Sequence, residues 1–485
     1  MKKLLAIALV AVFATVSLAS CGKIVDEGGD VSGSDTYNGS DVYNDGNLDN
    51  GTEDNTEDII DDNINNGGAD VGNSDNNDED NKNNEDNKND NNEDAKPQEK
   101  PTFNVKESTT GLKFVLNEDK LSYTLVSKGT ATAKAIVIDG HKGLPVTKVG
   151  YSAFGDDKNI TSVKLGDYVE IIEDQAFSMC SALASVTFGK NVKFLGDYSF
   201  RYCSALTSID LGKNIEVIKY GAFYNCKNLV DIKAYGKIRI IEDDVFMKTE
   251  YSTVASNWKN KVLYIGTNLI QAEGTISGTY KIEPNTTCIG GLAFYGCKSL
   301  SGIVIPDSVH SIGTKAFCDA TSLNTITVGN GVTYVGERAF YNTKYYNTSS
   351  KWTNNVLYVG KSAVAAKTSL SGTYTLTAGT KAIADMAFNN CKSLTSVVMP
   401  DSVVCIGEYA FLDCAKLSTV TIGSGAKEIG VYAFKDCTAL KNITMKKTSG
   451  WKADKIEVST DKLSNKADAA IYLGVYYSDK VWTRG

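Results

Sequence analysis

The sequence predicts an α/β repeat solenoid, a stack of about 13 coils with one short parallel strand in each coil. Its anchor is a phenylalanine that recurs after 23 residues in eight of ten steps and after 48 residues in the other two. A fixed period of this size indicates a solenoid, because each unit buries its apolar face only against its neighbours. The anchors are Phe154, Phe177, Phe200, Phe223, Phe246, Phe294, Phe317, Phe340, Phe388, Phe411 and Phe434.

Each 23-residue unit carries the same apolar positions relative to its anchor. A leucine such as Leu183 lies six residues after the phenylalanine, and an isoleucine such as Ile172 lies five before it. The run 420–422 alternates apolar and polar residues, as a short strand does. The Ala-Phe step suits a helical turn. Each coil is therefore predicted to be a strand, a turn, a short apolar rung and a helical turn.

The two 48-residue steps contain related sequences. Residues 258–266 and 352–360 share the pattern Trp-x-Asn-x-Val-Leu-Tyr-x-Gly. Ile282 and Leu376 each lie 12 residues before the next anchor, in register with the strand residues of the other coils. Each step is thus predicted to hold two coils, one without the Ala-Phe turn, so that eleven anchors and two extra coils give 13.

This repeat resembles the BspA-like leucine-rich repeats of bacterial surface proteins, and the resemblance runs from Val146 to Met445. It implies a right-handed solenoid with a parallel sheet, used for adhesion and protein binding. The fold transfers better than the function, because the family is large and its functions are diverse.

The N-terminus reads as an export signal. Lys2 and Lys3 precede an apolar run of 15 residues, 4–18, which is too short to span a bilayer comfortably and is typical of a secretory signal peptide. The end of this run, Leu-Ala-Ser-Cys21, resembles the bacterial lipobox, which implies cleavage after Ser20 and a lipid on Cys21. The alternative is an ordinary signal peptide with a chance cysteine. We expect an exported protein, lipid-anchored to the bacterial membrane or surface.

Residues 22–100 are predicted to be a disordered acidic tether. They hold 24 Asp and Glu against 5 Lys and almost no large apolar residues, so they bury too little surface to offset the entropy of ordering. A calcium loop at 41–52 is the sharper alternative. It is disfavoured, because Tyr43 stands where an oxygen ligand belongs and Thr52 stands where the loop needs its bidentate Glu.

The predicted organisation has five parts. They are a signal peptide over 1–20, the anchor cysteine and tether over 21–100, an N-terminal cap over 101–150, the solenoid over 151–445 and a C-terminal cap over 446–485. Strands are expected at 112–116 and 123–126, the apolar segments 135–138 and 143–146 lead into the first Ala-Phe turn, and a short helix is expected at 465–473. The last segment is alternatively a small binding element.

The cysteines follow the repeat. One per 23 residues does not match the clustered ligands of a zinc site, so we predict a ladder of buried, reduced thiols that act as small apolar groups; disulfides between neighbouring rungs are the alternative. Seven lie three residues after an anchor, two lie six before one, and one follows an anchor directly: Cys180, Cys203, Cys226, Cys297, Cys391, Cys414, Cys437, Cys288, Cys405 and Cys318.

Catalysis finds little support in the sequence. There are two histidines, His141 and His310, and no nucleophile elbow, zinc-protease motif or phosphate-binding loop. No enzyme activity, catalytic residue, metal or cofactor is predicted. Nucleic acid is excluded as a partner, because the net charge of 101–485, which is −8 + 19 − 2 = +9, is spread without a basic cluster.

Binding is the better hypothesis. Strand positions beside the core, such as Thr187 and Ser208, are small and bland, whereas Tyr and Arg near the Ala-Phe turns are the residue types of interface hot spots. The alternative is that these rings only cover the edge of the core. The candidates are Tyr198, Arg201, Tyr202, Tyr220, Tyr224, Tyr295, Tyr409 and Tyr432. The interruptions at 247–275 and 341–369 are further candidate surfaces.

We therefore expect a surface lipoprotein that adheres to host or neighbouring-cell surface or matrix proteins. The rival hypothesis is a structural or scaffold protein of the producing cell's own envelope.

Overall fold

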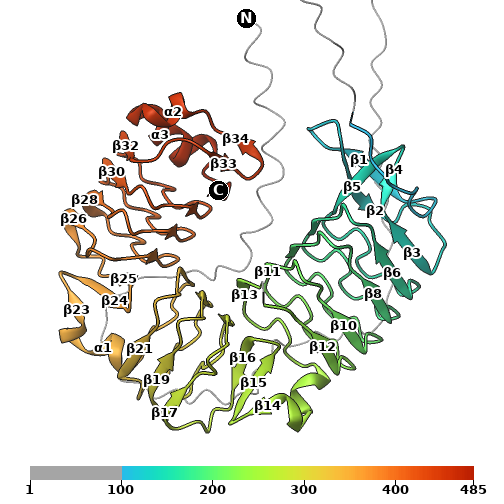
Figure 1. Ribbon diagram of the computed structural model, residues 1–485, viewed down its shortest axis with the longest axis horizontal. Helices are drawn as coiled ribbons and strands as arrows, with labels where there is room; N and C mark the ends of the chain where they lie inside the picture. The colour runs from blue at the N-terminus through green and yellow to red at the C-terminus, as the bar shows by residue number, and fades with distance from the viewer. Residues whose placement is uncertain (1–100, 237) are drawn as a thin grey trace, which may run out of the picture. The chain divides into compact units, whose positions relative to one another are not determined.

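The computed structural model describes residues 101–236 and 238–485, which form a curved stack of about fourteen turns (Figure 1). The predicted solenoid is confirmed, and its predicted number of coils is close. The expected lipidation of Cys21 and the acidic tether lie outside the described residues. Within those residues, every helix is too short or too polar to cross a membrane.

Each full coil contributes two parallel strands, where the sequence predicted one. The first is a two-residue rung just before the Ala-Phe turn, and the second lies after it. Neighbouring rungs pair one repeat apart, as Ile171 pairs with Phe194 and Val217 with Ile240. The second strands do the same, as Val163 pairs with Val186. The sequence predicted these rungs as apolar positions, but two residues are too few for alternation to identify them as strands.

The rungs belong to three successive sheets. The first comprises β1 (Lys113–Leu116), β2 (Tyr123–Ser127), β4 (Gly140–His141), β5 (Leu144–Val149), β7 (Ile171–Ile172), β9 (Phe194–Leu195), β11 (Val217–Ile218) and β13 (Ile240–Ile241). The second comprises β14 (Trp258–Lys259), β15 (Val262–Ile265), β16 (Asn268–Ala272), β18 (Cys288–Ile289), β20 (Ser311–Ile312) and β22 (Tyr334–Val335). The third comprises β23 (Trp352–Thr353), β24 (Val356–Val359), β25 (Ser362–Ala366), β27 (Ala382–Ile383), β29 (Cys405–Ile406), β31 (Glu428–Ile429), β33 (Trp451–Ala453), β34 (Ile456–Glu457) and β35 (Trp482–Arg484).

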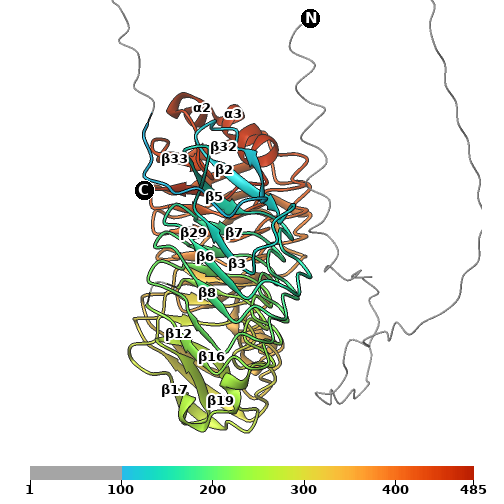
Figure 2. The ribbon, with the colours of Figure 1, turned by 90° about the vertical axis from the view of Figure 1, so that its right-hand side faces the viewer.

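The second strands of the coils form four smaller sheets. These comprise β3 (Ala135–Ile138), β6 (Ser162–Leu165) and β8 (Ser185–Thr187); β10 (Ser208–Asp210) and β12 (Asp231–Lys233); β17 (Gly278–Lys281), β19 (Leu300–Ile305) and β21 (Thr325–Val328); and β26 (Ser371–Thr375), β28 (Ser393–Val398), β30 (Thr419–Ile422) and β32 (Asn442–Met445). Figure 2 looks onto the N-terminal half of this series, where β3, β6, β8 and β12 follow one another along the stack.

The anchor phenylalanines form the centre of the core. Within each run of coils their rings stack nearly parallel, with centroids 4.9 Å apart for Phe388 and Phe411 and 5.5 Å apart for Phe223 and Phe246. All eleven side chains are buried. At the start of each later run a tyrosine takes the place of the missing ring: Tyr280 lies 6.0 Å from Phe294, and Tyr374 lies 6.0 Å from Phe388.

The Ala-Phe step is a series of hydrogen-bonded turns, so the prediction of a helical turn was wrong. In the coil of Phe177, the amides of Ser178 and Cys180 donate to carbonyls three residues back, at 2.9 and 3.3 Å. The Phe177 amide instead donates to Ser199 O of the next coil at 2.8 Å. Gln175 and Met179, two residues before and after the anchor, are left-handed with φ of 56° and 62°. These two residues interrupt helical geometry on both sides of the anchor. Amides such as that of Phe177 are therefore free to donate to carbonyls of the next coil.

The thiol ladder is confirmed. All ten cysteines of the described residues are buried and unpaired with one another. The Sγ of Cys180 donates to Phe154 O at 3.1 Å, and Cys203 Sγ donates to Phe177 O at 3.2 Å. Cys226, Cys414 and Cys437 repeat this contact to the anchor carbonyl of the preceding coil. Each of these thiols thus gives a second hydrogen bond to an anchor carbonyl that already accepts an amide of its own turn.

The two 48-residue interruptions are two copies of one structure. Each contains a short helical segment, an antiparallel hairpin and a final strand that joins the rungs. In the first, η1 (Glu250–Thr253) and η2 (Ala255–Asn257) precede the hairpin β14–β15 and the final strand β16. In the second, α1 (Lys344–Asn347) and η3 (Ser349–Lys351) precede the hairpin β23–β24 and the final strand β25. The predicted extra coil without an Ala-Phe turn is confirmed, because β16 and β25 pair in parallel with the rungs β18 and β27.

The inserts also interrupt the rung sheet. The amide of Gly291, after the first insert, donates to Ile241 O at 2.8 Å, and that of Asp385, after the second, donates to Val335 O at 3.0 Å. On this side the coils before and after each insert therefore touch directly. The inserted hairpin lies only on the opposite, outer side of the stack. Each insert therefore acts as a wedge, and the stack bends at both places (Figure 1).

The stack ends in two small modules. The two predicted N-terminal strands form as β1 and β2, and the apolar segments that follow them form β3 and β5. At the C-terminus, α2 (Thr460–Ser464) and α3 (Lys466–Ile471) pack beside β32, followed by a π-helical segment (Tyr472–Tyr476). Asn465 caps α3 by accepting from the amides of Ala467 and Asp468, which confirms the predicted helix.

Candidate functional site

Five of the eight predicted surface residues lie together on two adjacent coils. Tyr198, Arg201 and Tyr202 come from the coil of Phe200, and Tyr220 and Tyr224 come from the next coil. We call these five residues the aromatic patch. All five are half-buried. They flank the anchors Phe200 and Phe223, which are fully buried, so the packed core of each coil holds them in place.

Ring contacts join the two coils of the aromatic patch. The Tyr198 and Tyr220 rings meet edge to face with centroids 5.0 Å apart, and those of Tyr202 and Tyr224 do so at 6.0 Å. Tyr198 and Tyr202 are left-handed, with φ of 55° and 61°, which turns both side chains outward around the anchor. The Tyr198 amide donates to Tyr220 O at 2.8 Å. Backbone and rings together fix the spacing of the four tyrosines.

Arg201 lies at the centre of the aromatic patch. Its guanidinium carbon is 4.6 Å from the centroid of the Tyr198 ring and 5.1 Å from that of Tyr202. Its Nε is buried and makes no hydrogen bond within the described residues, and the same residues provide it with no ion-pair partner. A cation that lies against two aromatic rings and has no ion-pair partner among the described residues is suited to meet an anionic group of a partner.

The patch continues onto the coils on either side. Lys248 Nζ lies 5.1 Å from the centroid of the Tyr224 ring. Met179, which takes the place of Tyr202 in the preceding coil, is 39% exposed, and Met247, which takes the place of Tyr224 in the following coil, is 50% exposed. Alignment of the coils on their anchors places both methionines at these positions, but neither was among the predicted surface residues.

The other three candidates lie elsewhere. Tyr409 and Tyr432 occupy one position of two neighbouring coils beyond the second insert, with ring centroids 5.2 Å apart and Lys435 Nζ 4.7 Å from the Tyr432 centroid. They form a second, smaller aromatic pair. Tyr295 lies between the two inserts and is 43% exposed. The structure therefore divides the predicted residues into one patch of five, one pair and one separate residue.

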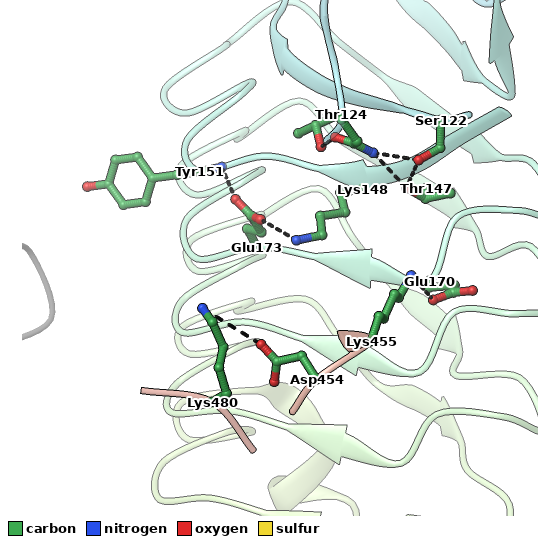
Figure 3. A network of polar contacts seen from close by, with 11 residues as sticks. Ser122, Thr124, Thr147, Lys148, Tyr151, Glu170, Glu173, Asp454, Lys455 and Lys480 are labelled. Carbon is green, nitrogen blue, oxygen red and sulfur yellow. Dashed lines mark hydrogen bonds and ion pairs between the residues drawn. The ribbon is translucent and has the colours of Figure 1, made fainter. Parts of the chain in front are cut away.

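The bends bring the two arms of the stack into contact on its inner side. Arg239 Nη2, next to β13, donates to both carboxylate oxygens of Glu428 on β31 at 3.0 Å. In Figure 3, Lys455 of the C-terminal module approaches Glu170 of an N-terminal coil, and the Nζ to Oε2 distance is 2.9 Å. Near it, Glu173 accepts from the Tyr151 amide at 3.0 Å. The inner face is thus occupied by contacts within the chain.

Carboxyl groups are buried where the arms meet. Tyr334 OH donates to Asp385 Oδ2 at 2.5 Å, and the Glu408 amide donates to Asp385 Oδ1 at 2.8 Å. Burial raises the pKa of Asp385 well above its usual value, and burial also raises the pKa of Glu408. Lys219, on the other arm, forms an ion pair with Glu242. Its positive charge lowers the pKa of both Asp385 and Glu408 and so opposes the effect of burial.

Two further carboxyl groups on the first arm behave alike. Burial, with Asp174 and Glu242 nearby, raises the pKa of Asp197 to about 6. Burial raises the pKa of Asp243 to about 7, although Lys315 Nζ lies 3.8 Å from its Oδ2 and lowers it. The inner face therefore changes its charge near neutral pH.

A protein-family model for the BspA type leucine-rich repeat region matches this chain in six copies, over residues 147–277, 287–374 and 369–450. These ranges cover more than half of the sequence. The chain belongs to the BspA-type leucine-rich repeat family. The matches follow the BspA-type coils through both inserts.

Solved structures with leucine-rich repeats resemble this BspA-type chain. A leucine-rich cell surface protein of Faecalibacterium prausnitzii is 24% identical, with 72% of this chain and 96% of that chain covered and a TM-score of 0.27. A T. pallidum leucine-rich repeat protein is 18% identical, covering 50% and 89%, with a TM-score of 0.27. The pneumococcal vaccine antigen PcpA is 17% identical, covering 67% and 88%, with a TM-score of 0.25. No curated protein matches the chain.

Proposed function

We propose that this chain is a cell-surface lipoprotein whose solenoid binds other proteins, in adhesion of the producing bacterium to host or neighbouring-cell surface or matrix proteins. The observation that carries the proposal is the aromatic patch, in which four tyrosines and an arginine from two coils form one continuous surface. Binding by this surface involves no catalysis and no cofactor.

The chemistry of the patch is that of a protein interface. Tyrosine and arginine are enriched among the residues that dominate binding energy, and methionine is enriched at interfaces. Here Met179 and Met247 flank the tyrosines and extend the apolar surface over four coils. The rings are already held by their neighbours, so little side-chain entropy is lost on binding.

The inner face is less suited to this role. Arg239 and Glu428 bridge the arms there, and Lys455 with Glu170 adds a second bridge. A partner on that face would first have to break both ion pairs. The patch on the turns needs no such rearrangement.

The signal peptide and lipidated Cys21 supply the location. Two or three acyl chains on one cysteine are enough for stable anchoring, and the acidic segment 22–100 is long enough to separate the solenoid from the membrane. The proposed localisation is extracytoplasmic, with the solenoid facing outward.

The experiment measures binding of the purified chain to immobilised matrix glycoproteins and to epithelial cells at physiological salt. The variant Tyr202→Ala/Tyr224→Ala removes one ring pair of the patch, and Tyr409→Ala/Tyr432→Ala is the matched control on another coil pair. We expect saturable binding that falls about 30-fold or more in the first variant, since hot-spot truncations cost 2 kcal/mol or more.

Equal binding by both variants would reject the patch. If neither target binds, while partners are recovered from the producing cell's own envelope extract, the scaffold function replaces adhesion. Surface protease treatment of intact cells tests the location separately, because a tether that resists cleavage contradicts outward display.

A further inference from the structure

A hollow of about 570 Å³ lies beside the second insert, away from the aromatic patch. It is open to solvent and lies between the helical segment that precedes the hairpin and the end of β25. Its lining combines two aromatic rings, one lysine and several hydroxyl and amide groups: Tyr346, Asn347, Ser349, Trp352, Ala366, Lys367, Thr368 and Ser369.

The two rings of this hollow are held at a fixed angle. Trp352 Nε1 donates to Tyr346 O at 2.7 Å, and the rings meet edge to face with centroids 5.2 Å apart. The Tyr341 ring also meets the Tyr346 ring edge to face, with centroids 5.3 Å apart. Lys367 Nζ lies 5.3 Å from the centroid of the Trp352 ring. The result is an apolar wall with a cation at its edge.

The first insert provides an internal comparison, because its residues correspond to those of the second at an offset of 94. Trp258 Nε1 donates to Ser252 O at 2.8 Å, as Trp352 does to Tyr346 O, and the hairpin registers agree. The tryptophan is therefore part of the fold in both copies. Tyr346 stands where the first insert has Ser252, so the second ring is particular to the second copy.

The two copies also differ in charge. Residues 250–275 hold two glutamates and two lysines, which cancel, whereas residues 344–369 hold four lysines and no acidic residue. Lys344 and Lys367 occupy the positions of Glu250 and Glu273. Within the described part of the chain, none of these four lysines lies within 4 Å of a carboxylate. The second insert thus carries positive charge that its own fold does not neutralise.

We propose that this hollow binds an acidic oligosaccharide. The apolar face of a sugar ring packs against Tyr346 and Trp352, and Lys367 pairs with a carboxylate or sulfate group of the ligand. The hydroxyl groups of Ser349 and Ser369 line the hollow beside these rings and meet sugar hydroxyls, and Asn347, whose Nδ2 donates to Asn342 Oδ1 at 2.9 Å, offers its amide oxygen.

An acidic peptide is the competing ligand, and the structure favours it less. An extended peptide gains most of its affinity by adding a strand to a sheet edge. The edge strand beside the hollow, β23, is only two residues long. The lining instead offers side-chain hydroxyls around an aromatic wall. The hollow and the aromatic patch use different residues, so failure of either proposal leaves the other standing.

The test titrates the purified full chain with defined probes at physiological salt. A heparin-derived tetrasaccharide carries sulfates, a hyaluronan-derived tetrasaccharide carries only carboxylates, chitotetraose is neutral, and hexaglutamate is an acidic peptide. Tyr346→Ser and Lys367→Glu convert the site to the residues of the first insert. Lys261→Glu makes the same charge change on the first insert and is the matched control.

We expect one of the two acidic tetrasaccharides to bind saturably and chitotetraose to bind far more weakly. Each site variant should weaken binding about tenfold or more, since each removes a charge-assisted or stacking contact. Lys261→Glu should change affinity less than twofold, and all variants should keep the wild-type melting temperature within about 3 °C. Whether the sulfated or the carboxylated sugar binds better identifies the acidic group.

Four results would overturn the proposal. They are no binding of either acidic sugar, equal binding of chitotetraose, an equal loss in Lys261→Glu, and hexaglutamate binding as tight as the sugars and insensitive to Tyr346→Ser. The last result would assign the site to acidic protein segments.

Discussion

Arg239 and Glu428 lie 189 residues apart in the chain, and Arg239 Nη2 donates to both carboxylate oxygens of Glu428 at 3.0 Å. Neither residue belongs to the repeated core. The pair forms because the two inserts bend the stack until its arms face each other. It joins two coils that would be far apart in a straight solenoid.

Removing this ion pair should loosen the contact between the arms. We expect Arg239→Ala and Glu428→Ala each to lower the free energy of unfolding, with a coupling energy of about 1 kcal/mol in a double-mutant cycle. Solution X-ray scattering should show a larger radius of gyration for each variant. The exchanged variant Arg239→Glu/Glu428→Arg is the control, and it should restore both values. An unchanged radius in the single variants would mean that the bends alone hold the arms.

The phenylalanine stack should dominate stability. Phe200 is fully buried between Phe177 and Phe223, with centroid distances of 5.2 and 5.3 Å. We expect Phe200→Ala to lower the unfolding free energy by about 4 kcal/mol, because it leaves a cavity inside a column of rings. Phe200→Leu should cost less than half as much. Chemical denaturation measures both changes, and equal small losses would show that the ring column is not the main core.

The thiol ladder predicts how the cysteines react. Burial raises the pKa of Cys180 and Cys226 to about 12, so these thiols stay protonated and unreactive. In the native chain at pH 8, alkylation should leave the ten cysteines from Cys180 to Cys437 unlabelled. After unfolding without reductant all ten should be labelled. Peptide mass spectrometry reads both states, and pairs that resist labelling in the unfolded chain would show disulfides instead.

The raised pKa of Asp243 predicts a stability that falls as pH rises. With a native value of about 7 against an unfolded value of 3.8, the native chain binds more protons than the unfolded chain between these values. Its contribution is favourable below pH 4 and is lost as pH rises through 7. Asp243→Asn should therefore be more stable than wild type at pH 8, by up to about 4 kcal/mol, and not at pH 4.

Thermal unfolding across this pH range measures the effect. Asp167→Asn is the control, because that carboxyl is exposed and its pKa is lowered by Lys190. A pH profile of Asp243→Asn parallel to that of wild type would contradict the burial of a titrating carboxyl.

Much of the fold follows from residues that can be counted in the sequence. The 23-residue period of the phenylalanines fixes the stack, and the repeated Trp-x-Asn-x-Val-Leu-Tyr-x-Gly pattern fixes the two inserts. The form of the Ala-Phe step did not follow, because left-handed residues such as Gln175 and Met179 are not glycine or asparagine and give no turn signal. The closure of the arms depends on the bend angle, to which no local pattern corresponds.

The candidate site was also predictable only in part, namely in the pairing of tyrosines on neighbouring coils. Tyr198 and Tyr220 are 22 residues apart and Tyr202 and Tyr224 are also 22 apart, so one-coil neighbours follow from the period alone. Tyr409 and Tyr432, 23 apart, pair for the same reason. The period does not predict which of these pairs share one surface, because two bends of the stack separate Tyr224 from Tyr409. The insert hollow depends on differences between two copies that their common pattern conceals.

The most direct test of the central claim maps the surface that a bound partner covers. Hydroxyl-radical footprinting of the chain, alone and bound to a matrix glycoprotein, reports the exposure of each side chain. Binding through the aromatic patch predicts protection of Tyr202, Tyr224 and Met247, with Tyr295 and Tyr432 unchanged. Protection confined to the inner face or to the C-terminal module, with the patch still reactive, would contradict the proposal.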